Sequence, residues 1–170
     1  MLHEIPYSEL TFNPMTAFAK DWMALAAGNE TDGCNAMTVS WGHVGALWDS
    51  SLPTAVCYVR PQRYTKQFID REDLFTLSCF GNEQRSALTI LGQKSGRDGD
   101  KIKEAGLTPV FENGTVHFAE ARLVLVCRKL YHAPILEEGF VDPAMAARNY
   151  PAKDFHEMYI GQIIKVLKDD

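Results

Sequence analysis

Alternating apolar and polar residues along the chain predict a protein built mainly of β-strands. In the stretch 35–42, the apolar residues Met37, Val39 and Trp41 alternate with Thr38 and Ser40. A strand there places bulky side chains on one face and hydroxyl groups on the other. Further strand-like runs are expected at residues 7–12, 22–27, 54–60, 73–80, 120–131 and 156–167, the last bent at Gly161.

Helical spacing is confined to short segments between these runs. Asp98 is expected to cap a short charged helix that Gly106 ends, and Pro143 is expected at the first position of another. Around six or more strands without a regular β-α-β alternation point to a barrel with peripheral helices. The predicted helices are 64–69, 83–91, 99–105 and 142–148.

Two turn signals complete the pattern. Ser50-Ser-Leu-Pro53 looks like a turn before the strand at 54–60. Asn113-Gly114 is a hairpin signal between two short strands, at 110–111 and 116–118.

Composition limits the class of partner. With 170 residues and 46% apolar content, we expect one domain, 1–170, with residues 1–21 as an N-terminal lead-in. The net charge of −5 argues against nonspecific binding to nucleic acid or to anionic membranes. The chain shows no apolar run of membrane-spanning length and no signal-peptide layout at its start, so it is expected to be cytoplasmic.

The cysteines and histidines form no metal-binding pattern. None of the four cysteines forms a C-x-x-C pair, so they are expected to act as small buried hydrophobes, in keeping with a reducing compartment. The histidines are scattered, and we assign no metal.

The stretch 58–65 has the chemistry of a phosphate receptor. Arg60, Arg63 and Thr65 follow an apolar run at a strand-to-helix turn, where guanidinium forks and backbone N–H groups favour an anion. The alternative for both arginines is an ordinary surface ion pair. For Thr38 and Ser40, the alternative is that their hydroxyls face solvent.

Seven stretches follow one another along residues 22–165, at 35–42, 58–65, 75–78, 94–101, 106–109, 120–127 and 158–161. Together they resemble the flavin reductase-like, FMN-binding split-barrel family, in its flavoredoxin-like branch. The resemblance implies a six-stranded antiparallel split barrel with peripheral helices. It also implies a homodimer that holds FMN non-covalently in a groove near the subunit boundary.

The resemblance also implies the residues that contact FMN, in four groups. Those beside the flavin are Asn35, Met37, Thr38, Val39, Ser40 and Trp41. Those near its phosphate or ribityl chain are Arg60, Arg63 and Thr65, with Tyr64 also at the cofactor. Phe75 to Ser78, including Leu77 and Ser78, border the ring. The loop 95–101 adds polar contacts, from the same subunit or across the dimer, through Ser95, Gly96, Asp98 and Lys101.

Some of these residues also have a purely structural interpretation. Asp98 could be a helix cap, and Lys101, one turn later, could form an intrahelical charge pair with it. His156 matches a histidine that lies close to the flavin ring in related reductases, where imidazole could orient nicotinamide as a catalytic residue. The alternative is a partly exposed histidine at a strand edge.

Two functions remain open. The first is an NAD(P)H-dependent flavin reductase, in which hydride passes from NADH or NADPH to bound flavin and the cofactor carries the chemistry. No G-x-G-x-x-G is present, so nicotinamide would dock directly on the open flavin face. The second is a flavoredoxin-like electron carrier that exchanges electrons with a redox protein partner. A flavin-free module on the same barrel is a third, weaker reading.

Overall fold

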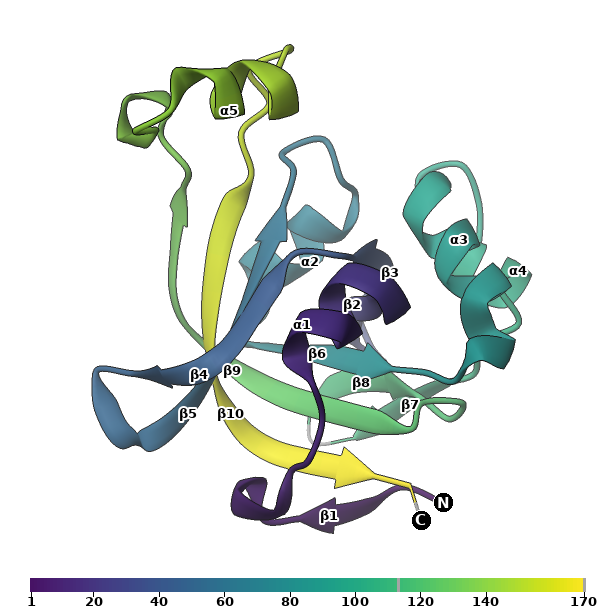
Figure 1. Cartoon of the computed structure of the whole chain (residues 1–170). Helices are drawn as coiled ribbons and strands as arrows, with labels where there is room; N and C mark the ends of the chain where they lie inside the picture. The colour runs from purple at the N-terminus through teal and green to yellow at the C-terminus, as the bar shows by residue number, and fades with distance from the viewer. Residues whose placement is uncertain (113, 170) are drawn as a thin grey trace.

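An antiparallel sheet curls around the main apolar core in the computed structural model, which describes residues 1–112 and 114–169 (Figure 1). Within these residues the sheet has eight strands, and β1 (His3–Ile5) pairs with β10 outside the main path. In spatial order the other strands are β3 (Gly33–Val39), β2 (Met23–Asn29), β6 (Leu74–Cys79), β9 (Leu123–Pro134), β10 (Glu157–Lys168), β5 (Asp49–Val59) and β4 (Gly42–Leu47).

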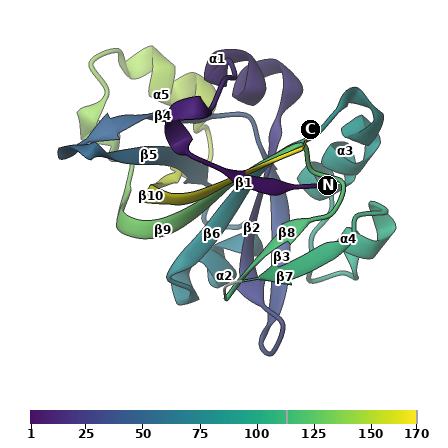
Figure 2. The same cartoon turned by 90° about the horizontal axis from the view of Figure 1, so that it is seen from below.

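The helices lie around this sheet. Figure 2 shows α3, α4 and a separate β7–β8 hairpin together on the side of β2 and β3, away from the β4–β5 hairpin. The α5 helix stands at the end of an arm that leaves β9 and returns into β10 (Figure 1). The bounds are α1 (Pro14–Thr16), continued by a π-helical turn (Ala17–Asp21), α2 (Thr65–Arg71), α3 (Arg85–Gln93), α4 (Lys101–Glu104), α5 (Pro143–Asn149), β7 (Pro109–Glu112) and β8 (Thr115–Phe118), with 3-10 turns at Tyr7–Glu9, Asn82–Gln84 and Glu137–Gly139.

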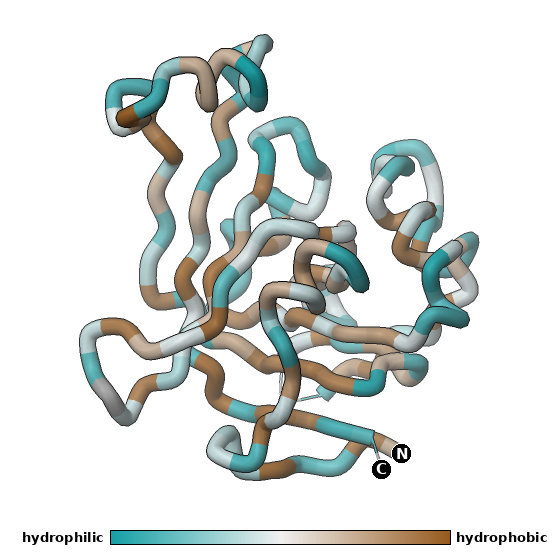
Figure 3. The backbone as a smooth tube through the Cα atoms, in the orientation of Figure 1, coloured by the Kyte–Doolittle hydropathy of each residue, from teal (hydrophilic) through white to brown (hydrophobic). Residues whose placement is uncertain are grey.

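Strand β2 is buried on both faces, which explains its continuous apolar run. Leu25 belongs to the barrel core, whereas Ala24 and Ala26 face a second core beneath α3 and β8. Alanine on that face lets the second layer approach closely, and Leu88 and Phe118 fill the space between the layers. Figure 3 shows apolar residues along the strands and mostly polar residues in the α4 region.

The mainly β architecture and the bend at Gly161 are confirmed. The pairing of β10 with β9 shifts register between Ile160 and Gly161, and a Cβ at Gly161 would lie 2.7 Å from the Phe75 ring. The β7–β8 hairpin is also confirmed, although Asn113 lies outside the described residues. The sheet is larger than the six strands expected.

Two local predictions at the N-terminal half are wrong. Residues 7–12 form a 3-10 turn and a loop, and the first strand lies earlier, at His3–Ile5. Ser50–Pro53 belongs to β5, and the reversal is at Trp48, whose φ is 66°. Pro53 is tolerated because β10 pairs with β5 only as far as Thr54, so no ladder hydrogen bond toward β10 is lost.

The start of α4 also differs from the prediction. Asp100, not Asp98, caps the helix, and its Oδ1 accepts a hydrogen bond of 3.0 Å from the N–H of Lys103. The helix therefore runs only from Lys101 to Glu104, and Gly106, the predicted stop, follows two residues later with a φ of 70°. No helix in the described part of the chain is long and apolar enough to cross a membrane.

Candidate functional site

Strand β3 is an edge strand, and two pockets adjoin it. Over the described residues it pairs with β2 on one side and has no strand partner on the other. Alternate residues of an edge strand therefore turn unpaired backbone N–H and C=O groups outward, where a ligand can meet them.

One pocket, of about 120 Å³, is called here the cationic pocket. Its two cations bind the end of α3. The Arg63 guanidinium donates from Nη1 to the carbonyl of Gly92 at 2.7 Å and from Nη2 to that of Leu91 at 3.0 Å. The Lys101 ammonium donates to the carbonyls of Leu91 at 3.0 Å and Lys94 at 3.1 Å. The pocket is lined by Gln62, Arg63, Tyr64, Gln93, Lys94, Ser95 and Lys101.

These contacts give both cations a structural role, because the last carbonyls of a helix have no partner within it. Their charge is not neutralised, however. Within the described residues, neither Arg63 nor Lys101 forms an ion pair with a carboxylate. Burial and the neighbouring Arg63 lower the pKa of Lys101 to about 8, and burial lowers the pKa of Arg63. Two desolvated cations side by side favour an anion.

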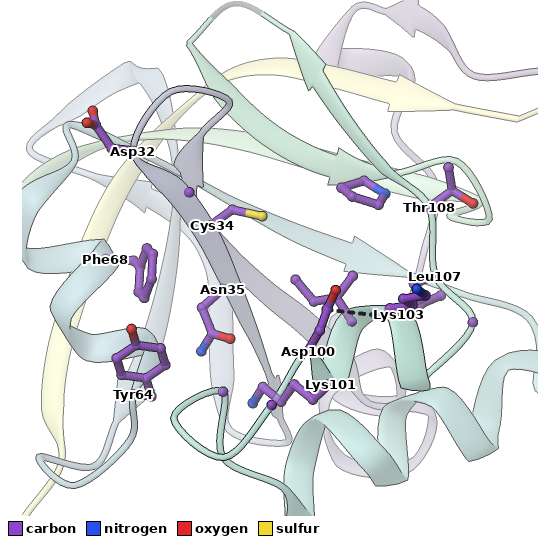
Figure 4. Close-up of a pocket in the computed structure, with 16 residues that line it drawn as sticks. Asp32, Cys34, Asn35, Tyr64, Phe68, Asp100, Lys101, Lys103, Leu107 and Thr108 are labelled. Carbon is purple, nitrogen blue, oxygen red and sulfur yellow. Dashed lines mark hydrogen bonds between the residues drawn. The ribbon is translucent and has the colours of Figure 1, made fainter.

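The loop after α3 is held tightly beside this pocket. A Cβ on Gly96 would lie 2.5 Å from Oδ1 of Asn35 and 2.8 Å from the Tyr64 ring, so only glycine fits there without a shift. Asn35 in turn donates a buried hydrogen bond of 2.9 Å to Oγ1 of Thr65. In Figure 4, Asn35, Tyr64 and Lys101 surround one end of a wider pocket of about 840 Å³.

The second pocket, of about 210 Å³, is called here the aromatic pocket. Its wall pairs the half-exposed Trp41 with His156, whose ring centroids are 4.8 Å apart. The His156 Nδ1 lies 2.9 Å from the Tyr150 hydroxyl. Burial, followed by the charge of Arg60, lowers the pKa of His156 to about 4, so the imidazole is neutral at pH 7. The lining residues are Met37, Thr38, Val39, Ser40, Trp41, Tyr58, Arg60 and His156.

Thr38 joins the two pockets. It lines the aromatic pocket, and its hydroxyl donates to the carbonyl of Leu88 in α3. Its Cβ would lie 3.4 Å from a Cβ on Gly92, the residue whose carbonyl holds Arg63. The two pockets are therefore neighbours on either side of one α3–β3 contact. Thr38 is half-buried and hydrogen-bonded, so the solvent-facing alternative is wrong for it but holds for Ser40.

The structure separates the two arginines that the sequence analysis placed together. Arg60 forms an ion pair with Asp154, donates to the carbonyl of Asn149 at 3.0 Å, and lies in the aromatic pocket. The turn after Pro61, closed by a 3.1 Å hydrogen bond from the Arg63 N–H to the Arg60 carbonyl, sends the second arginine to α3. Arg63 instead lies beside Lys101 at the end of α3. Lys101 donates to backbone carbonyls there and forms no ion pair with Asp98, so the alternative of an intrahelical charge pair is wrong.

Eleven of the predicted residues line the two pockets, and Asn35 and Gly96 lie directly beside them. The other four lie elsewhere. Thr65 is fully buried beneath Asn35, and Asp98 is exposed and lines neither pocket. Leu77 and Ser78 are fully buried in the central strand β6, so the structure does not bring them to the site.

Sequence reasoning missed Tyr58, Tyr150 and Asp154. Tyr58 is on β5 and Arg60 is the first residue after that strand, so alternation along the extended chain could have placed both on one face. Tyr150 and Asp154 reach the site only because the arm folds back, and no local pattern signals that contact.

A family model described as "Flavin reductase like domain" matches residues 15–170 of the chain. A comparison of the chain with curated proteins finds no match. A search of solved structures finds an FMN-binding domain of a flavin reductases-like enzyme from Shewanella baltica, with a TM-score of 0.69 and 14% identity over 99% of this chain and 78% of that one.

Two further structures have the same fold. Flavoredoxin of Desulfovibrio vulgaris (Miyazaki F) matches with a TM-score of 0.68 and 18% identity, over 95% of this chain and 76% of that one. A protein described as a putative flavin reductase with split barrel domain, from Shewanella frigidimarina, matches with a TM-score of 0.67 and 18% identity, over 96% of this chain and 77% of that one. The chain therefore has the split-barrel fold.

Proposed function

The chain belongs to the flavin reductase-like domain family, and we propose that it is a flavoprotein that holds FMN non-covalently beside the free edge of β3. The observation that carries this proposal is a pair of desolvated cations, the half-buried Arg63 and the buried Lys101, without a carboxylate partner among the described residues. A phosphate would supply the missing negative charge. The cofactor-binding structures with the same fold support the proposal.

The residues present fit such a cofactor at both ends. Arg63 has five N–H donors and uses two on α3, and Lys101 uses two of its three, so donors remain for a phosphate. Outward backbone groups of β3 can hydrogen-bond the polar edge of a flavin ring, while Met37, Val39 and Trp41 supply an apolar wall that excludes water.

We further propose that the protein is an NAD(P)H-dependent flavin reductase. When bound, FMN would accept hydride from NADH or NADPH and pass the electrons on. The neutral His156 has one ring nitrogen that can donate and one that can accept, and Nδ1 is taken by Tyr150. Its Nε2 is then the atom that can hydrogen-bond a bound ring, with Trp41 fixing the imidazole plane.

Two features of this proposal concern the assembly and its location. We expect a homodimer, because apolar side chains of the β4–β5 hairpin and β9 are exposed, namely Leu47, Trp48, Leu130 and Tyr131. Trp48 and Tyr131 contact each other, with ring centroids 6.3 Å apart, so this surface is continuous. The expected location is the cytoplasm, where NAD(P)H is present.

The alternative is a flavoredoxin-like electron carrier. The acidic net charge of −5 favours it, because such a surface would suit a basic redox protein partner. In that case FMN would bind tightly, and nicotinamides would reduce it only slowly.

The test is anaerobic stopped-flow mixing of the FMN-loaded protein with NADH or NADPH. Rapid bleaching of the flavin band with either donor supports the reductase, and slow bleaching with both supports the carrier. A colourless protein that FMN does not stabilise against heat would contradict both functions.

A further inference from the structure

A fourth cavity, of about 890 Å³, opens between the N-terminal helical segment and the α5 arm. It is called here the arm pocket. It lies next to the aromatic pocket, since Ser40, Trp41 and Tyr58 line both. Its other lining residues are Pro14, Met15, Phe18, Ala19, Gly42, His43, Ile135, Phe140, Met145, Arg148, Asn149 and Tyr150.

Most of this lining is apolar or aromatic. Phe18 and Trp41 lie on the barrel side, and Phe140 and Tyr150 lie on the arm side, where their ring centroids are 6.1 Å apart. Aromatic walls favour a flat, conjugated molecule, because ring stacking adds to the burial of apolar area. The volume is in the range usual for small-molecule sites.

The arm pocket also carries a positive charge. Among the residues that line it, Arg148 is the only lysine, arginine, aspartate or glutamate. Its guanidinium donates to the sulfur of Met145 at 3.4 Å and forms no ion pair with a carboxylate among the described residues. The pocket is thus locally cationic in a chain of net charge −5, which selects for an anion.

We infer that the arm pocket binds a planar, conjugated molecule that carries a negative charge, with Arg148 as the residue that selects the charge. Its use as the second-substrate site rests on the proposed function, since the shared wall at Trp41 would place that molecule beside the flavin ring. Two sources have this chemistry: a reduced nicotinamide nucleotide, which donates hydride, and an aromatic acceptor bearing an acidic group.

The first part of the test measures binding and needs no flavin chemistry. Calorimetric titration of the full chain, with and without FMN, uses 2-naphthalenesulfonate as an anionic planar probe and 2-naphthalenemethanol as its neutral counterpart. We expect the anion to bind more tightly at low salt. Arg148→Ala should weaken anion binding about two- to fivefold, as for an exposed ion pair, and leave the neutral probe unchanged. Added salt should reduce the difference.

Control variants make the result specific. Arg148→Lys should retain most of the preference for the anion. Arg128→Ala, at an exposed arginine on β9 outside the pocket, should bind like the unmodified chain. Phe140→Ala should weaken both probes, with a thermal unfolding scan to verify that the arm remains folded.

The second part of the test distinguishes the two candidate ligands, the nicotinamide nucleotide and the acidic aromatic acceptor. Nicotinamide mononucleotide and anthraquinone-2-sulfonate are each tested for displacement of 2-naphthalenesulfonate, and the one that displaces it is assigned to the pocket. With FMN-loaded protein, Arg148→Ala should raise KM for that substrate and leave kcat unchanged.

The inference is overturned if 2-naphthalenesulfonate does not bind, as expected if a second copy of the chain covers the pocket. It is also overturned if Arg148→Ala binds the anion as tightly as the unmodified chain does. Because this binding does not require FMN, its failure is distinct from a failure to bind the cofactor.

Discussion

Arg63 and Lys101 donate hydrogen bonds to the same carbonyl oxygen, that of Leu91 near the end of α3, from positions 38 residues apart in the sequence. The helix end attracts both cations, and burial, followed by the charge of the neighbouring Arg63, then lowers the pKa of Lys101. The site therefore exists before any ligand arrives, because the fold itself needs these side chains where they are.

The first prediction concerns the phosphate. Lys101→Met should weaken FMN binding by about 1.5–3 kcal/mol, or about ten- to hundredfold, because it removes a charged hydrogen-bond donor. Binding is measured by quenching of flavin fluorescence on titration with protein. Riboflavin, which lacks the phosphate, should bind both proteins equally.

Lys103→Met is the matched control, since this exposed lysine lies two residues away on the same helix. It should bind FMN like the unmodified chain. An equal loss of affinity for riboflavin and FMN in Lys101→Met would place the phosphate elsewhere.

The second prediction concerns alkaline pH. The pKa of Lys101 is about 8 in the folded chain, below its ordinary value of 10.5. A bound phosphate favours the charged form, so FMN binding should take up a proton and weaken as the pH rises through 8. FMN titrations between pH 7 and 9.5 should show this decline in the unmodified chain. The decline should be absent in Lys101→Met.

The same residue affects folding with the opposite sign. Between pH 8 and 10.5 the unfolded chain holds the Lys101 proton more tightly than the folded chain does, so this group makes the free energy of unfolding rise with pH. Urea unfolding of FMN-free protein should show a smaller rise across this window for Lys101→Met. A steeper rise would contradict the assigned shift.

The third prediction concerns His156 and acid. Its pKa is about 4 in the folded chain and near the ordinary 6.5 when unfolded. Between these values the unfolded chain binds more protons, so stability falls as the pH drops from 6.5 to 4. His156→Gln should remove up to about 3 kcal/mol of this loss, measured by urea unfolding at pH 4.5 and 7. The control is His43→Gln, at an exposed histidine, which should lose as much stability between pH 7 and 4.5 as the unmodified chain does.

The fourth prediction concerns the loop at Gly96. Gly96→Ala would force its Cβ against Asn35 and Tyr64, and overpacking of this kind costs about 1–3 kcal/mol. Chemical unfolding should show this loss, together with weaker FMN binding, as the loop moves from the cationic pocket. Gly45→Ala has open space around its Cβ and serves as the control. Equal stabilities of the two variants would argue that the loop is free to move.

The sequence predicts those parts of the site that depend on local pattern. Alternation along 35–41 places Met37 and Val39 in the core and Ser40 in solvent, as observed. It could not place Lys101 beside Arg63, because that contact depends on how α3 packs on β3. The two arginines lie in different pockets for a related reason: a single turn after Pro61 points their side chains in different directions.

Burial was the other property that local pattern could not supply. Leu77 and Ser78 occupy a strand that resembles its neighbours in sequence, but β6 lies between β2 and β9 and is covered on both faces. Thr65 is hidden in the same way by the hydrogen bond from Asn35. Covering layers come from distant segments, so only the folded chain reveals them.

The pairing of β1 with β10 sets His3 opposite Lys168, so the chain starts and stops side by side, across the barrel from the α5 arm (Figure 1). A short glycine-rich linker could therefore join the two ends, and new ends could be opened at an exposed loop without breaking the sheet. Fluorophores or surface tethers attached at these two ends would lie far from the cationic and aromatic pockets. The ends are therefore suitable for attaching the protein to an electrode.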